Sequence, residues 1–383
     1  MSQVTITANE PERPAMEMLR RLTDRRVFEQ LLDADSLTRT EIAARTGISK
    51  PTISESVRRL IDADLVVESG RQVGGRGRAG TFCRLRAEYT AALAISVGPD
   101  GVVVDTFDLK NRPIAHADQP VPAPIDGAEL RPIFLAAVDA AVRETAGTVG
   151  SCVVSMAGPV DRKTGRLVQS PYSPFLIGEF APGEILRDIA TVVEVDNDVN
   201  WAALAEHEHG NATDLDDFTL AYLGEGIGGA VVIGGSIVRG KRGLAGELAH
   251  ARTTGPAVRS LTLFECMAAW NLLKPGAEAI DVGRVRSIVE GRSTADRRRA
   301  GDIAGAVAGA INSVVALLDP QGVLIGGPWG CAPGFLDLVA DRLGPLADAE
   351  LILRPTGLTK APYHDGARIR AVATARQAVA DAF

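Results

Sequence analysis

The chain has few cysteines, no long apolar segment and no excess of basic residues. Only four cysteines occur in 383 residues, and they lie far apart at Cys83, Cys152, Cys266 and Cys331. Together with the absence of a signal peptide, this usage predicts reduced thiols and a cytoplasmic protein. Glycine or charge interrupts the apolar runs well short of the ~18 residues that a transmembrane helix needs, so we expect no membrane span.

The composition that remains predicts a folded protein of more than one domain. Hydrophobic residues make up 46% of the chain and charged residues 23%, which is enough to bury a large core. The net charge of -7 is unevenly distributed, because residues 1–90 hold 15 basic and 13 acidic residues and the remainder holds 26 and 35. A weakly basic segment on an acidic body argues against a general polyanion binder.

The N-terminal part carries the capping signals of two short helices joined by a sharp turn. Thr38 and Glu41 have the spacing of a capping box, and Ser49 is placed to cap a second helix. Gly47 suits the left-handed turn between them. Apolar residues recur at helical spacing in the second helix, at Ile53, Val57, Leu60 and Ile61. This pattern predicts a helix-turn-helix, with an ordinary αα-hairpin as the alternative.

Two predicted strands, Leu65–Ser69 and Thr81–Leu85, follow the second helix and enclose a polar loop. The loop carries Arg76 and Arg78 among glycines, so two guanidinium groups lie on a backbone thin enough for an A·T-rich minor groove. A solvated hairpin tip is the alternative. The arrangement predicts a winged helix-turn-helix that binds double-stranded DNA. The residues that we expect to contact DNA on the exposed side of the second helix are Ser49, Lys50, Thr52, Ser54 and Arg58.

The chain is therefore predicted to have three segments. We expect a disordered arm over residues 1–15, the DNA-binding domain over 16–87 and an α/β body over 88–383. In the body, a succession of strands followed by helices occurs twice, with the second round beginning at Phe218. The simplest interpretation of this repeat is two lobes with a cleft between them. We expect the lobes to divide near 198–217 and a closing helix over 367–382 to return to the first lobe.

Five motifs of the body resemble, in their order, the ROK family of sugar kinases and sugar-responsive repressors. The resemblance covers roughly residues 16–383. It implies an actin-like, hexokinase-like (ribonuclease H-like) α/β body, and it implies that a member with a winged helix is a transcription factor. The motifs are Met156-Ala157-Gly158-Pro159-Val160-Asp161 with Thr164-Gly165, Val195-Asp196-Asn197-Asp198-Val199-Asn200, Gly224-Glu225-Gly226-Ile227-Gly228-Gly229, Gly243-Leu244-Ala245-Gly246-Glu247-Leu248-Ala249-His250, and Asp319-Pro320 to Gly326-Gly327.

The resemblance implies ligand-binding roles for five residues. Asp198 matches the catalytic base of the family's kinases, and Asn197 matches an amide that binds a sugar hydroxyl. Glu247 and His250 match sugar contacts, and Glu265 matches a glutamate that ends the metal loop and reaches the sugar. Carboxylates, an amide and an imidazole supply the mixed acceptors and donors that vicinal hydroxyls need. As alternatives, each residue is a helix cap or a surface charge.

The sequence departs from the family's pattern in four places, and the first two, in the phosphate loops, argue against ATP binding. Ser96-Val97-Gly98-Pro99-Asp100 stands where the kinases have an aspartate and a glycine pair. Glu225 replaces the usual hydroxyl residue of the second phosphate loop, where it would repel a triphosphate by up to about 4 kcal/mol at ~4 Å. No cysteine lies between His250 and Glu265, so a zinc site lacks its ligands. Tyr172 stands where many members have a sugar-binding asparagine. We expect no catalytic residues, no cofactor and no metal.

The sequence thus predicts a transcriptional regulator, a repressor, that binds a DNA operator as a homodimer or tetramer. A carbohydrate or sugar phosphate in the cleft is expected to control it. One alternative is an active ATP-dependent ROK sugar kinase that carries a DNA-binding module. The other is a regulator that has no small-molecule ligand.

Overall fold

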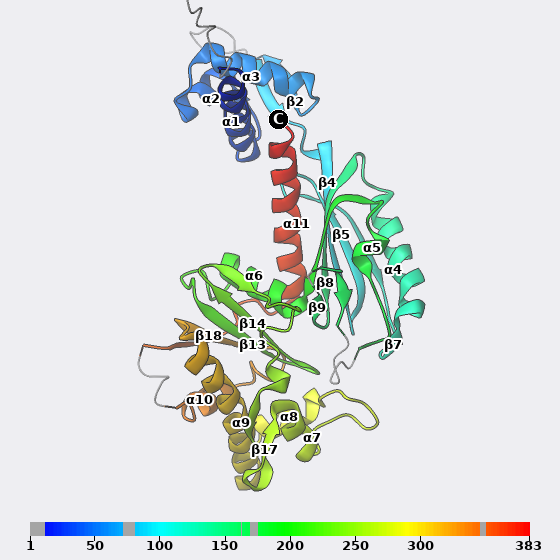
Figure 1. The fold of residues 1–383 in the computed structure, drawn as a ribbon, viewed down its shortest axis with the longest axis vertical. Coiled ribbons are helices and arrows are strands. Elements are labelled where there is room, and N and C mark those ends of the chain that lie inside the picture. The colour runs from blue at the N-terminus through cyan, green and yellow to red at the C-terminus, as the bar shows by residue number, and fades with distance from the viewer. Residues whose placement is uncertain (1–11, 72–80, 162, 169–174, 345–349) are drawn as a thin grey trace, which may run out of the picture.

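The computed structural model describes residues 12–71, 81–161, 163–168, 175–344 and 350–383. Three parts follow one another along its long axis: an N-terminal winged-helix module, a first α/β lobe and a second α/β lobe (Figure 1). Helix α1 begins at Glu12, inside the segment 1–15 for which we expect a disordered arm. Arg76, Arg78 and Tyr172 lie outside the described residues.

The N-terminal module packs three helices against an antiparallel sheet of strand order β1-β3-β2. Each helix contributes to one buried cluster, as Phe28, Ile42 and Ile53 show. The cluster also includes Cys83 and Leu85 of the last strand, so helices and sheet share a core. The elements are α1 (Glu12–Leu32), β1 (Leu37–Thr38), α2 (Arg39–Thr46), α3 (Lys50–Asp62), β2 (Val66–Arg71) and β3 (Thr81–Leu85).

The first lobe is built on a five-stranded mixed sheet of order β12-β8-β4-β5-β6. Strands β4 and β8 are apolar along most of their length because helices cover both faces of the sheet. Leu93 and Ile95 pack in the cluster of helix α4, whereas Ala92 and Ala94 face helix α11. The elements are β4 (Thr90–Gly98), β5 (Gly101–Phe107), β6 (Pro113–Gln119), β7 (Ile125–Asp126), α4 (Gly127–Val142), β8 (Thr148–Met156), β9 (Val160–Asp161), β10 (Arg166–Leu167), β11 (Leu176–Ile177), α5 (Pro182–Ile185), β12 (Ala190–Asn197) and α6 (Asp198–His209).

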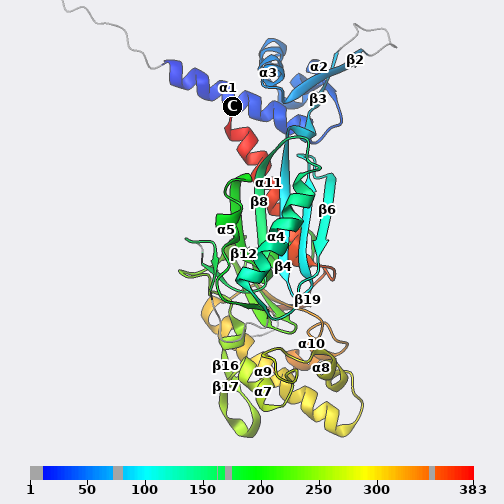
Figure 2. The same cartoon turned by 90° about the vertical axis from the view of Figure 1, so that its right-hand side faces the viewer.

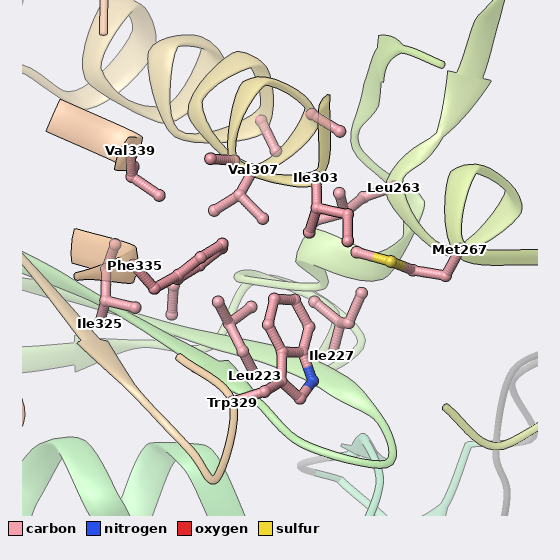
Figure 3. Packing of buried hydrophobic residues seen from close by; sticks show 14 of the residues in the cluster. Leu223, Ile227, Leu263, Met267, Ile303, Val307, Ile325, Trp329, Phe335 and Val339 are labelled. Atoms are coloured by element: carbon pink, nitrogen blue, oxygen red, sulfur yellow. The ribbon is translucent and has the colours of Figure 1, made fainter. Parts of the chain in front are cut away.

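The second lobe repeats this topology in the order β15-β14-β13-β18-β19, with an antiparallel half and a parallel half. Its core lies between the sheet and helix α9, where the rings of Trp329 and Phe335 meet edge to face at 5.6 Å, beside Ile303 and Val307 (Figure 3). The elements are β13 (Phe218–Leu223), β14 (Ile227–Ile233), β15 (Ser236–Val238), η2 (Leu248–His250), β16 (Arg252–Thr254), β17 (Ser260–Thr262), α7 (Leu263–Ala269), α8 (Val282–Val289), α9 (Thr294–Leu318), β18 (Gly322–Gly326), α10 (Phe335–Ala340) and β19 (Ile352–Pro355).

Helix α9 is, among the described residues, the one helix long and apolar enough to cross a membrane. Half of its most apolar stretch is nevertheless buried inside the second lobe. It packs there against α8, α10 and β16, and its buried residues form a large part of that lobe's core. Its apolar composition is therefore explained by its place as a core helix.

Helix α11 (Pro362–Asp381) runs from the junction of the lobes to the N-terminal module (Figures 1 and 2). It packs along β4, β8 and α6. A Cβ atom at Gly366 would collide with the backbone of Trp201, so this position requires glycine for α11 to lie so close to α6. At the far end, the ring of Phe383 meets that of Phe28 in α1 at 6.2 Å. Helix α11 and the residues that follow it therefore connect the junction of the lobes with the N-terminal module.

A buried carboxylate ties α6 to the segment that leads into α11. Glu206 has no exposed surface, and its Oε2 atom accepts hydrogen bonds from the amides of Asn211 (2.8 Å) and Gly357 (2.9 Å). Its Oε1 atom accepts one from the amide of Leu358 at 2.8 Å. Charge-assisted bonds to backbone amides are strong, and these three fix the relative positions of the two helices.

We predict that Glu206→Ala lowers the free energy of unfolding by about 2–4 kcal/mol, because three backbone amides lose their acceptor and a buried side chain is removed. Glu206→Gln should cost less, since one oxygen still accepts. Urea unfolding followed by circular dichroism measures both effects. The control is Glu208→Gln, an exposed residue of the same helix. A loss below about 0.5 kcal/mol for Glu206→Ala would show that the tie contributes nothing to stability.

Candidate functional site

The two helices of the turn form as their capping residues predict. Glu41 Oε2 accepts from the Thr38 amide at 2.7 Å, and Thr38 Oγ1 accepts from the Glu41 amide at 3.2 Å, which completes the capping box. Gly47 has a φ of 71°, the left-handed conformation expected there. Ser49 caps α3 by accepting from the amide of Thr52 at 3.4 Å. The predicted helix-turn-helix is confirmed by this geometry.

Helix α3 turns its apolar side inward, burying Ile53, Val57 and Leu60. The opposite side is open to solvent. All five residues that we expect to contact DNA from this helix are exposed, namely Ser49, Lys50, Thr52, Ser54 and Arg58. The hydroxyls of Ser49 and Thr52 lie 2.7 Å apart within the cap, so these two side chains also stabilise the start of α3.

A long-range ion pair that the sequence does not reveal holds α3 on α1. Arg59 donates from Nε and Nη2 to the two carboxylate oxygens of Asp24, at 2.9 and 2.6 Å. The Asp24 side chain is only 7% exposed, so this pair is shielded from solvent. Bidentate geometry of this kind orients a helix precisely enough to present its outer face to a groove. Arg76 and Arg78 belong to the loop between β2 and β3, outside the described residues.

In the body, two predicted carboxylates converge where the lobes meet. Asn197 caps α6, and its Oδ1 atom accepts from the Val199 amide at 2.9 Å. Asp198 opens the same helix, and burial raises its pKa to about 7. Glu247 reaches this place from the loop before η2, and burial followed by the charge of Asp198 raises its pKa to about 7. Two half-buried carboxylates of the same sign therefore lie near one another where the lobes meet.

The other two predicted ligand residues are placed differently. His250 ends η2, three residues after Glu247, and is exposed. Glu265 lies in the first turn of α7, where its Oε2 atom accepts from the amide of Thr262 at 2.7 Å in a second capping box. This bond lowers the pKa of Glu265. The alternative interpretation of Glu265 as a helix cap thus describes its bonding, and its role as a ligand stays a prediction.

Sequence reasoning missed a group of phenols beside the cleft carboxylates. The Tyr363 hydroxyl, in the first turn of α11, donates to Asp100 Oδ2 at 3.2 Å. Burial and then the charge of Asp198 raise the pKa of Tyr222 to about 12, and burial and then Asp100 raise the pKa of Tyr363. Acidic and phenolic groups therefore gather where the resemblance implies a phosphate loop. No local motif marks Tyr222 or Tyr363, because the fold alone brings them together.

The residues that replace the two phosphate loops are engaged in other contacts. Ser96, expected as a departure from the family's aspartate, is buried and shares a hydrogen bond with His364 Nδ1. The other ring nitrogen of His364 pairs with Asp105 at 2.7 Å. Glu225 forms an ion pair with Lys274. That ammonium offsets the charge of Glu225, so the repulsion of a triphosphate is weaker than the sequence suggests.

Comparison with known proteins identifies both parts of the chain. Residues 20–67 match the winged helix-turn-helix DNA-binding family, and residues 92–266 match the ROK family. The chain carries a ROK domain behind a winged helix-turn-helix. Within the parts of the chain that the structure describes, no three His, Cys, Asp or Glu side chains are placed to hold a metal ion.

Curated relatives include both enzymes and regulators. The chain is 37% identical over 157 residues to the bifunctional enzyme NanE/NanK of Brucella melitensis, covering 40% of this chain and 30% of that one. It is 23% identical over 240 residues to the DNA-binding transcriptional dual regulator NagC of Escherichia coli, covering 61% and 58%. A xylose repressor of Caldicellulosiruptor bescii is 22% identical over 241 residues, with 61% and 59% covered. The matches thus span between 30% and 59% of the length of these relatives.

Two solved structures show the fold. A ROK family transcriptional regulator, described as a homologue of the Escherichia coli MLC protein, covers 94% of this chain and 98% of its own, with a TM-score of 0.66 and 20% identity. The ROK hexokinase of Thermus thermophilus covers 74% of this chain and 98% of its own, with a TM-score of 0.58 and 24% identity. The predicted fold, a winged helix-turn-helix on an actin-like, hexokinase-like body, is confirmed.

The raised pKa of Asp198 predicts how stability changes with pH. Between the ordinary carboxyl pKa and about 7, the folded protein binds more protons than the unfolded chain, so its stability falls as the pH rises through this window. Asp198→Asn removes one of the two facing charges. It should raise the free energy of unfolding by roughly 1–3 kcal/mol at pH 8 and by much less at pH 5.

Urea unfolding at both pH values measures this difference, with Glu208→Gln on the same helix as the matched exposed control. An Asp198→Asn variant that is equally or less stable at pH 8 would show that the two carboxylates do not repel one another in the folded protein.

Proposed function

We propose that this ROK protein is a cytoplasmic transcriptional regulator, a repressor, that binds a DNA operator as a homodimer or tetramer. A carbohydrate or sugar phosphate in the interlobe cleft controls its operator affinity. The NagC protein and the xylose repressor, whose names denote regulators, and the regulator structure that covers 94% of the chain support this proposal. The proposed body has no catalytic role and needs no cofactor or metal.

Helix α11 is the observation that carries the proposal. Its first turn contacts the cleft through the bond from Tyr363 to Asp100, and its last turn contacts the DNA-binding module. There Arg25 of α1 donates to Gln377 at 3.4 Å, and Phe383 packs on Phe28. A helix of 20 residues spans about 30 Å as a stiff element, so movement at the cleft is transmitted to the module.

The cleft carboxylates supply the differential binding that such control requires. A ligand shifts a conformational equilibrium only if it binds one state more tightly. Asn197 and Asp198 approach from the α6 side, and Glu247 and His250 approach from the second lobe. A sugar held by both sets binds the closed form more tightly. Its hydroxyl groups donate hydrogen bonds that offset the desolvation cost of Asp198 and Glu247.

The alternative of an active kinase has one specific observation behind it, the 37% identity to NanE/NanK over 157 residues. The groups on the phosphate side of the cleft argue against it. Asp100, Tyr363 and Tyr222 stand where metal–ATP would have to bind, and Ser96 is engaged by His364. Turnover of a hexose with ATP and magnesium that disappears in Asp198→Asn would favour the kinase over our proposal.

For DNA binding, we predict a pseudo-palindromic operator with half-sites about one or two helical turns apart and A·T-rich flanks. Lys50→Ala should lose discrimination between operator and unrelated DNA, because this exposed side chain stands at the start of the recognition helix. Arg76→Ala combined with Arg78→Ala should weaken A·T-flanked sites most. Fluorescence anisotropy over a salt series measures both.

The matched control is Arg297→Ala, an exposed arginine of α9 far along the chain from the module. Unchanged operator affinity and salt slope in the doubly substituted loop would show that the two arginines do not enter the groove.

For the cleft, we predict that Asp198→Asn and Glu247→Gln keep operator binding without ligand nearly intact and abolish the response to an identified sugar. The wild-type response should amount to about 1–3 kcal/mol, or roughly 5–150-fold in operator affinity. Glu265→Gln is the informative comparison, because glutamine preserves the capping box. A retained response in Glu265→Gln marks that residue as a cap.

Operator affinity by anisotropy, with and without sugar, measures the response of each variant. A fully responsive Glu247→Gln variant would contradict the assignment of the cleft, and a wild-type protein that answers to no sugar would favour a regulator without a small-molecule ligand.

A further inference from the structure

A cavity lies between the lobes, and the carboxylates Asp198 and Glu247 are not among its lining residues. Its volume is about 570 Å³, within the range of small-molecule sites. Strand β12 is the last strand of the first sheet and β15 is the last strand of the second, and both line the cavity. Helix α11 contributes Arg370. None of the proposed sugar ligands Asn197, Asp198, Glu247 and His250 is among its lining residues.

The carboxylates of the cavity are all held by arginine. Asp196, nearly buried, accepts from Arg239 Nε and from the Asn200 amide nitrogen at 2.8 Å. Glu194 accepts from Arg370 Nε at 2.9 and 3.0 Å. The third lining carboxylate, Glu184, accepts from two nitrogens of Arg166 at 3.0 and 3.3 Å. The negative charge of the cavity is thereby neutralised by fixed partners.

The basic groups, in contrast, keep donors for a further ligand. Arg370 uses only its Nε atom, so its two terminal nitrogens have no partner among the described residues. The guanidinium of Arg239 lies 5.9 Å from the ring centre of Trp201 and donates from Nη1 to the Ile237 carbonyl oxygen at 3.4 Å, so these contacts hold it at the cavity wall. Lys163 and Arg187 also line the cavity; Lys163 interacts with the carboxylate of Asp161, and Arg187 has no partner in the described part of the chain.

Planar guanidinium groups with unused terminal N–H donors are the side chains that suit phosphate oxygens best. The group formed by Asp198, Glu247 and Asp100 has the opposite character, because these carboxylates favour hydroxyl donors over an anion. Of the two ligands proposed for the cleft, this charge favours the neutral carbohydrate, whereas the basic cavity favours a phosphate.

We propose that the cavity between β12 and β15 is a binding site for a phosphate monoester of monosaccharide size, held by Arg239 and Arg370 with Lys163 and Arg187. This site is separate from the cleft of the proposed function. The ligand would contact both lobes and, through Arg370, the helix that reaches the DNA-binding module. Binding to the site does not depend on the proposed function being right.

Isothermal titration of the full-length protein in a phosphate-free buffer tests the site, with glucose 6-phosphate, inorganic phosphate and glucose as probes. We expect one glucose 6-phosphate per chain, bound at least tenfold more tightly than inorganic phosphate. Arg187→Gln and Arg370→Gln should each weaken binding about tenfold or more, because each removes charge-assisted hydrogen bonds. Arg239 is not substituted, because its loss would leave the buried carboxylate of Asp196 without its ion-pair partner.

Arg286→Gln is the matched control, since Arg286 is a half-exposed arginine held by Glu290 on α8, away from the cavity. It should bind glucose 6-phosphate like the wild type. Arg370→Lys keeps the charge but loses the fork of donors, and it should fall between the wild type and Arg370→Gln. Circular dichroism confirms that each variant is folded.

Three results would overturn the proposal. The first is no heat of binding for either phosphate probe at about 10 mM, a concentration that detects even weak sites. The second is undiminished binding in the double variant Arg187→Gln, Arg370→Gln. The third is loss of phosphate binding in Lys50→Ala, which would place the anion on the DNA-binding face. Phosphate binding that is retained in Glu247→Gln shows that this site is independent of the sugar cleft. The two proposals can therefore fail separately.

Discussion

The close packing of α11 on the first lobe is the constraint on which the rest of the architecture depends. Gly366 lets the helix lie against the backbone of α6, and the alanines at 367, 371 and 375 continue the contact. Protein interiors are packed too densely to deform continuously, so such a contact is kept or broken as a unit. Glu206 adds a polar tie at the point where the chain enters the helix. The lobes, the cleft and the DNA-binding module are therefore positioned relative to one element.

The acidic group shows a local arrangement that costs stability. Asp198 and Glu247 lie near one another, and burial makes each of them harder to ionise. Nothing in the folding of the lobes requires two acidic groups at this junction, and carboxylates that are hard to ionise weaken the folded protein at neutral pH. Under the proposed function, the hydroxyl donors of a ligand offset this cost. The same carboxylates serve a kinase or a sensor equally well, so it is the phosphate side of the cleft that decides between the two.

Much of the DNA-binding module could be predicted from the sequence because its signals are local. Thr38 with Glu41 and Ser49 with its following proline act within one helical turn, and the structure forms both caps. The pair between Asp24 and Arg59 was beyond such reasoning, since 35 residues separate the partners. Nothing in either residue's neighbourhood marks it as half of a buried ion pair. The position of α3 on α1 is consequently a tertiary property.

The body shows the same division between local and distant information. Its repeated succession of strands and helices predicts two lobes, and the structure contains two sheets of the same topology. The cleft residues were found through resemblance, because their separate motifs carry no geometry of their own. Lys274 and Glu225 illustrate the limit, since their ion pair changes the electrostatics of a loop that the sequence alone makes repulsive. Tyr222 and Tyr363 belong to the site for the same reason, through folding and not through any motif.

Strand β12 borders two groups of side chains that differ in charge. Asp196 and Asn197 are neighbours in the chain, yet their side chains have different partners. Asn197 caps α6 beside the acidic cleft, whereas Asp196 anchors Arg239 at the wall of the basic cavity. Under the two proposals, a neutral sugar and a phosphate ester are distinguished by charge before any contact with their hydroxyl groups is made. Asp198 and Trp201 lie on α6, and Tyr363 and Arg370 lie on α11, so a ligand at either proposed site would act on the same packed contact.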